Sequence, residues 1–154
     1  MTLREKELKF RQLNLEYQKK SAGINRRKDE VSREKYRRLL AIRMETAAKR
    51  DEIRTAIDML RDERLKFERD TPAYMEKTEA IHIQEDRIAR LKEQTGVEIE
   101  KVEGDAYATR LQFDEDALRL ACWMDSEKLR ILKQYEQEHC DGEREETAST
   151  TDNL

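Results

Sequence analysis

Apolar or aromatic side chains recur at every seventh position along much of this 154-residue chain. One series contains Leu3, Phe10, Tyr17, Ile24 and Val31, and a second contains Leu39, Ile53, Leu60, Phe67, Tyr74, Ile81 and Ile88, with Thr46 as its one polar member. We call these positions the heptad seam. A seven-residue period sustained over so many turns is typical of a long α-helix that keeps one face against a partner. The sequence therefore predicts an all-α protein built from long coiled-coil helices.

Composition supports a helical coiled coil over a globular domain. Charged residues make up 44% of the chain and apolar residues 36%, with four glycines and one proline. So few apolar side chains, spread over such a length, cannot bury the surface that a compact domain of this size buries. No run approaches the ~20 apolar residues that cross a bilayer, and the first residues lack the apolar core of a signal peptide. We expect no membrane association and a cytoplasmic protein in which Cys122 and Cys140 are reduced thiols.

Charge is distributed unevenly between the two parts of the chain. Residues 1–69 contain 21 basic and 13 acidic residues, and the remainder contains 11 and 22. Two interpretations follow: an antiparallel hairpin whose arms attract each other, or a basic arm that binds an external acidic surface. The charge pattern alone does not choose between them.

Proline and glycine divide the predicted helices. Thr71 and Pro72 have the residue types of a helix N-cap and first helical position, so a hinge is expected there. The seam crosses this point in phase, which leaves a kinked rod as the alternative to a hairpin. Gly96 and Gly104 bracket a predicted connector, with a helix that tolerates both glycines as the alternative. Gly23 is expected to be only a soft spot in a continuous helix. The predicted segments are a basic arm at 1–70, a second helix at 71–95, a connector at 96–104, a docking helix at 105–139 and a disordered acidic tail at 140–154.

No pattern of residues predicts chemistry. The chain has no glycine-rich phosphate loop, nucleophile elbow or paired-cysteine motif, so we expect no enzymatic activity and no cofactor. His82 and Glu85 have a spacing found in metal sites, but such sites need ligands from more than one helix, and His139 beside Cys140 has no further ligands of suitable type. We therefore expect no metal site.

The predicted functional surface is a set of partner-binding side chains. Aromatic seam residues are enriched as interface anchors, although an ordinary coiled-coil core explains them equally well, and the patch around Trp123 is the densest apolar cluster. The predicted partner-binding residues are Phe10, Tyr17, Tyr36, Ile53, Leu60, Phe67, Tyr74, Ile81, Leu118, Trp123 and Met124. Basic residues form a predicted basic surface at Arg26, Arg27, Lys28, Arg33, Lys35, Arg37 and Arg38.

The chain resembles, at a general level, the small and highly charged coiled-coil proteins of cytoskeletal and ciliary assemblies, which lie along larger filaments. That resemblance favours a structural or adaptor protein. We expect it to bind an acidic filament surface such as tubulin through its basic arm and other coiled coils through residues 105–139. The apolar patch around Trp123 also allows homo-oligomers. Two alternatives are a nucleic-acid-associated helical protein, disfavoured by the acidic residues among the basic ones, and a helical chaperone similar to prefoldin. The prefoldin resemblance depends on long helices around a short central segment, and the strand hairpins of that family are not evident in the sequence.

Overall fold

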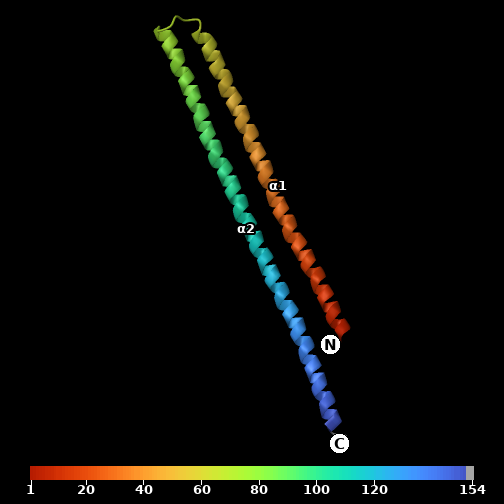
Figure 1. Cartoon of the computed structure of the whole chain (residues 1–154). Helices are drawn as coiled ribbons and strands as arrows, with labels where there is room; N and C mark the ends of the chain where they lie inside the picture. The colour runs from red at the N-terminus through yellow and green to blue at the C-terminus, as the bar shows by residue number, and fades with distance from the viewer. Residues whose placement is uncertain (152–154) are drawn as a thin grey trace. The chain divides into compact units, whose positions relative to one another are not determined.

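The protein is an all-α antiparallel hairpin of two long helices. A computed structural model describes the backbone of residues 1–151 and the side chains of residues 1–140. Helix α1 covers Leu3–Arg64 and helix α2 covers Pro72–Thr151, and residues 1–151 contain no strand (Figure 1). None of the described helices has a stretch with the length and apolarity needed to cross a membrane. Of the two predicted arrangements, the structure has the hairpin.

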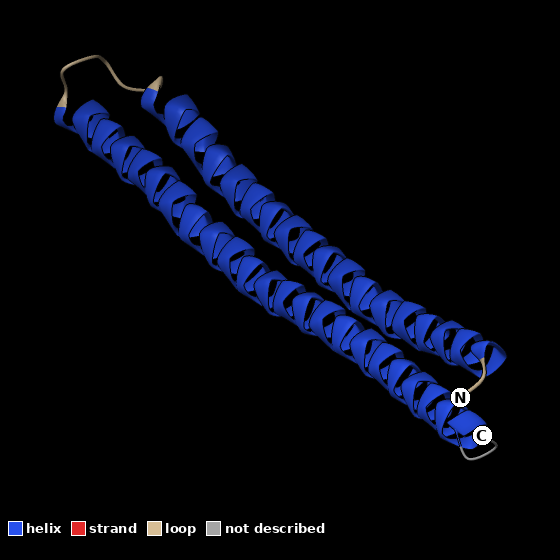
Figure 2. Ribbon diagram, turned by 60° about the horizontal axis from the view of Figure 1, so that its bottom comes forward, coloured by secondary structure: helices blue, strands red, loops and turns tan. Residues whose placement is uncertain are grey.

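Two compact units make up the hairpin. Unit 1 combines Met1–Glu30 with Arg110–Leu154, and unit 2 is the continuous segment Val31–Thr109. In each unit a segment of α1 lies antiparallel to a segment of α2 (Figure 2). The basic N-terminal arm thus pairs with the acidic C-terminal half of the chain, the first of the two interpretations of the charge asymmetry.

The core of unit 2 contains a cluster of isoleucines, besides the buried residues Leu39, Val102 and Ala106. Ile53 and Ile57 of α1 contact Ile81 of α2, which is only 4% exposed, and three further apolar residues pack against this cluster: Leu60, Ile88 and Leu91. Seam positions from the two helices meet here, as the seven-residue period requires of a coiled coil. Burial of this face stabilises the helices, because most helix stability in proteins comes from packing of the apolar face and not from propensity.

Unit 1 has a more varied core. Leu13 of α1 packs with Met124 and Ile131 of α2, and three aromatic residues, Phe10, Tyr17 and Trp123, lie against this cluster. Leu13 lies three positions after Phe10, at the second core position of its heptad, where most other heptads of α1 carry a charged residue. Gly23 lies within uninterrupted helix, so the prediction of a continuous α1 is confirmed.

The turn between the helices begins earlier than predicted. Helix α1 ends at Arg64, not at residue 70, and residues 65–71 form the connection. Asp70 has a φ of 65°, a left-handed conformation that helps reverse the chain. The Thr71 hydroxyl accepts a hydrogen bond from the Tyr74 amide at 3.3 Å, and Pro72 occupies the first helical position, so the predicted N-cap is confirmed.

The predicted connector at 96–104 is wrong. Helix α2 continues through Gly96 and Gly104, so the helices predicted at 71–95 and 105–139 are parts of one helix. Each glycine costs roughly 1 kcal/mol relative to alanine, whereas burial of Val102 and Ala106 against α1 contributes favourably across the same turns. Of the predicted tail at 140–154, residues 152–154 and all side chains from residue 141 lie outside the described residues, and the described part of α2 extends to Thr151.

Candidate partner-binding groove

Most of the predicted partner-binding residues contact the other helix of the same chain. Ile53 and Ile81 belong to the unit 2 core, with Leu60 packed against it. Tyr74 is partly buried, with the Arg64 guanidinium 5.1 Å from its ring centroid. These residues therefore pack within the chain's own coiled-coil core, which is the predicted alternative to partner binding.

The same holds for the predicted residues of unit 1. Met124 is buried, and Phe10, Tyr17 and Trp123 pack around it. The Lys20 ammonium lies 4.1 Å from the Trp123 ring centroid, which covers the exposed side of the indole with a cation. Trp123 and Met124 of this apolar patch thus pack in the core of unit 1, whereas Leu118 and Cys122 of the same patch are exposed.

Three predicted partner-binding residues face solvent instead. Tyr36 is 71% exposed, Leu118 is 67% exposed and Phe67 is 43% exposed. Phe67 lies in the turn, outside both helices, although its spacing places it in phase with the seam. Since their side chains are not used by the fold, Tyr36 and Leu118 remain available for a partner.

The predicted basic surface is divided between the two units. In unit 1, Arg26 and Arg27 are exposed, and Lys28 forms an ion pair with Asp114 of α2. In unit 2, Arg33, Arg37 and Arg38 are exposed and Lys35 is half-buried. The predicted basic residues therefore belong to two separate groups, one in each unit.

A groove with a basic rim lies between the helices of unit 2. Partly buried isoleucine, leucine and threonine side chains form its floor, and three exposed cationic side chains form its rim: Arg50 and Arg54 from α1 and Lys92 from α2. The full lining is Thr46, Arg50, Arg54, Ile88, Leu91, Lys92, Thr95, Gly96 and Ile99. No acidic residue lines this groove, and among the described side chains none of its three cations forms an ion pair.

Two features shape the floor of this groove. The hydroxyls of Thr46 and Thr95 form a hydrogen bond of 2.9 Å, so the polar exception in the heptad seam is satisfied by a threonine on the opposite helix. A Cβ atom added to Gly96, which lines the groove, meets no atom within 4 Å, so a larger side chain has room to extend from this position. An apolar floor with a cationic rim suits a ligand that combines apolar and acidic groups.

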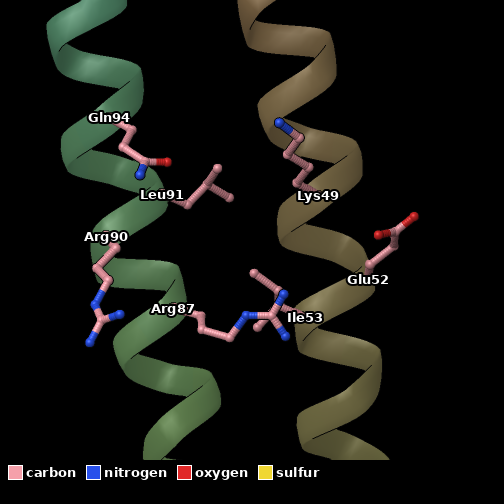
Figure 3. A pocket seen from close by; sticks show the side chains of 7 residues that line it. All are labelled: Lys49, Glu52, Ile53, Arg87, Arg90, Leu91 and Gln94. Carbon is pink, nitrogen blue, oxygen red and sulfur yellow. The ribbon is translucent and has the colours of Figure 1, made fainter.

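A neighbouring groove of unit 2 has a mixed rim. It is lined by Lys49, Glu52, Ile53, Arg87, Arg90, Leu91 and Gln94. Figure 3 shows the Arg87 side chain extending from α2 toward Ile53 of α1, whereas Arg90 points away along its own helix. Arg87 thus occupies space that a ligand would need, and Glu52 adds a negative charge, so this groove is less suited to an acidic partner.

Two further observations concern metal-ligating and charged side chains among the described residues. No group of three or more His, Cys, Asp or Glu among them is positioned to hold a metal ion. The clearest ion pair of unit 2 joins Lys77 and Glu63 at 2.8 Å, and the hydrogen bond and charge of Lys77 hold the pKa of Glu63 below its ordinary value. This pair lies beside the turn and not at either groove.

Comparison with known proteins adds no assignment, since no protein-family model, curated protein or solved structure matches the chain. The groove residues Arg50, Lys92 and Gly96 were absent from the predicted site. Arg50 and Arg54 are four residues apart and therefore share a helix face, a signal that the sequence contains. Their approach to Lys92 depends on the hairpin, which the sequence did not establish.

Proposed function

We propose that this protein is a non-enzymatic structural or adaptor coiled coil, and that the basic-rimmed groove of unit 2 binds an acidic, amphipathic segment of a larger assembly. The observation that carries the proposal is the combination of an apolar floor with Arg50, Arg54 and Lys92 on the rim, without an acidic residue. The general resemblance to cytoskeletal and ciliary coiled coils favours a microtubule-associated assembly in the cytoplasm or cilium. Tubulin is then the acidic surface to test first.

Binding in this groove needs no covalent chemistry. Apolar side chains of the partner cover Ile88, Leu91 and Ile99, while its carboxylates approach the three cations of the rim. Arginine suits such a rim because its planar guanidinium bonds a carboxylate through two donors. The charge contribution weakens with added salt, whereas the apolar contribution persists.

Co-sedimentation with microtubules tests the charge requirement. Arg50→Glu with Arg54→Glu is expected to weaken binding at least about tenfold, because two attractions become repulsions. The matched control is Arg87→Glu with Arg90→Glu, which makes the same charge change in the same unit but at the neighbouring groove (Figure 3). Equal loss in both variants contradicts groove-specific binding, and a wild-type chain that stays in the supernatant contradicts the choice of tubulin.

Glycine substitutions test the shape requirement without changing charge. Gly96→Leu is expected to fill the groove and reduce binding, while Gly104→Leu leaves it open. A Cβ atom at either position meets no neighbour within 4 Å, so both variants are expected to stabilise the helix relative to glycine. Unchanged binding by Gly96→Leu, with a raised thermal midpoint, contradicts occupation of the groove.

Two rival functions have separate tests. The basic rim also suits a polyanion, so a nucleic-acid-associated protein is expected to bind duplex DNA or RNA with an affinity that falls steeply with salt. The helical hairpin is the feature favouring a prefoldin-like chaperone, although residues 1–151 contain no strand. That function predicts suppression of the aggregation of an unfolded client by an oligomer.

A further inference from the structure

Unit 1 has apolar side chains on the sides of both helices that face away from its core. On α2, Leu111, Leu118, Cys122 and Leu129 are all exposed and separated by steps of seven, four and seven residues. At 3.6 residues per turn they fall within an arc of about 40°, roughly half a turn from Met124 and Ile131. Two acidic residues, Glu115 and Asp125, are interleaved with them, and we call these six residues the acidic outer face.

Helix α1 has a corresponding surface of opposite charge. Leu8 is 48% exposed and Leu15 is 62% exposed, and exposed Ala22 continues the same seven-residue step. These positions lie about half a turn from Leu13 and Tyr17 in the core. The basic residues Arg4, Arg11 and Lys19 are interleaved with them, and we call these six residues the basic outer face.

We propose that the basic outer face of one copy of this chain binds the acidic outer face of a second copy. The two faces have matching leucine spacing, since Leu8 and Leu15 are seven residues apart, as are Leu111 and Leu118. Their charges are complementary, and among the described side chains Arg4, Arg11, Lys19, Glu115 and Asp125 form no ion pair within the chain. Pairing of the basic face with a second basic face, or of the acidic face with a second acidic face, would place like charges together and lower the affinity.

This pairing makes a heterologous contact. Each copy uses one face and leaves the other free for the next copy, so association continues instead of ending at a dimer. Each face has only three or four apolar side chains, and the interface therefore falls in the weak, reversible class. Assembly of this kind is independent of the unit 2 groove.

Sedimentation velocity over a wide concentration range tests the proposal with the full chain. The average sedimentation coefficient is expected to rise continuously with concentration and to fall at high salt. A chain that remains monomeric at every soluble concentration overturns the proposal, and so does a dimer of constant size.

Charge reversal identifies the two faces. Glu115→Arg with Asp125→Arg, and separately Arg4→Glu with Arg11→Glu, are each expected to weaken self-association at least about tenfold, while an equimolar mixture of the two variants restores it because each complements the other. The control is Glu79→Arg with Glu93→Arg, which changes exposed residues of α2 in unit 2 by the same charge. Circular dichroism confirms folding of each variant. A mixture that stays as weakly associated as its components overturns the proposal, and so does equal loss in the control.

Discussion

The two units solve the same packing problem with different side chains. Unit 2 buries only aliphatic side chains, with a cluster of three isoleucines from both helices, whereas unit 1 combines leucine, methionine and isoleucine with a surround of aromatic rings. Isoleucine is stiff at χ1 and packs in a defined geometry, while methionine adapts to an irregular space. In unit 1, lysine ammonium groups also lie over aromatic rings: Lys6 over Tyr135 and Lys20 over Trp123. One heptad period therefore accommodates an aliphatic core in unit 2 and a mixed core with aromatic residues in unit 1.

The largest expected effect comes from truncating the two cores. Ile81→Ala in unit 2 is expected to cost about 3 kcal/mol, and Met124→Ala in unit 1 about 2 kcal/mol, because the isoleucine site is less able to collapse around a cavity. Urea unfolding gives the two free energies. Native-state hydrogen exchange then shows whether each variant loses protection only in its own unit.

Equal losses of protection throughout the chain in both variants contradict two separable units. That result indicates that the two units unfold together as one cooperative structure. Leu118→Ala is the matched control, since this side chain is 67% exposed and outside both cores, and it is expected to change stability by less than about 0.5 kcal/mol.

The helices were predictable, but the direction of the second helix was not. The heptad seam crosses the turn in phase, from Phe67 to Tyr74 to Ile81, so periodicity is the same for a kinked rod and for a hairpin. The structure makes Phe67 a turn residue and Tyr74 a half-buried ring beneath Arg64. Periodicity reports which face is apolar and contains no information on what covers it.

The connector predicted at 96–104 was wrong for a related reason. Gly96 and Gly104 have the residue type of a helix end, but their local cost is smaller than the burial gained by the turns between and after them. The groove beside Gly96 is a tertiary feature, formed by residues about 40 positions apart in the sequence. A site of this kind cannot be read from spacing until the pairing of the helices is known.

A smaller loss of stability is expected from changes to the aromatic side chains around the unit 1 core. Trp123→Ala is expected to cost about 2 kcal/mol, less than removal of a fully buried tryptophan, because the ring is only partly buried. Lys20→Met is expected to cost about 0.5 kcal/mol through loss of the cation over the ring. Urea unfolding measures both. A Lys20→Met effect that persists unchanged in the Trp123→Ala background excludes the cation–π contact as its cause.

A third and smaller effect is expected at the polar layer of unit 2. Thr46→Val and Thr95→Val are each expected to cost about 1 kcal/mol, since each leaves one partly buried hydroxyl without its partner. The double variant is expected to be close to the wild type, because valine keeps the shape and neither hydroxyl remains. A double-mutant cycle by chemical unfolding measures the coupling. Strictly additive losses contradict a hydrogen bond that matters to the fold.

The smallest expected effect is a pH-dependent contribution of the Lys77–Glu63 ion pair, beside the turn of unit 2, to thermal stability. Lys77 lowers the pKa of Glu63 from 4.5, so the contribution of this carboxylate is present above that pH and is lost as the pH falls through the lowered pKa of the folded state. Glu63 in turn raises the pKa of Lys77 above 10.5, so the same pair loses its contribution at strongly alkaline pH. The thermal midpoint of the wild type minus that of Glu63→Gln is therefore expected to shrink below about pH 4.5 and above about pH 10.5.

Both side chains are partly exposed, so high salt is expected to reduce the difference at neutral pH as well. A difference that stays constant from acid to alkaline pH means that Glu63 acts through packing or helix propensity and not through its charge.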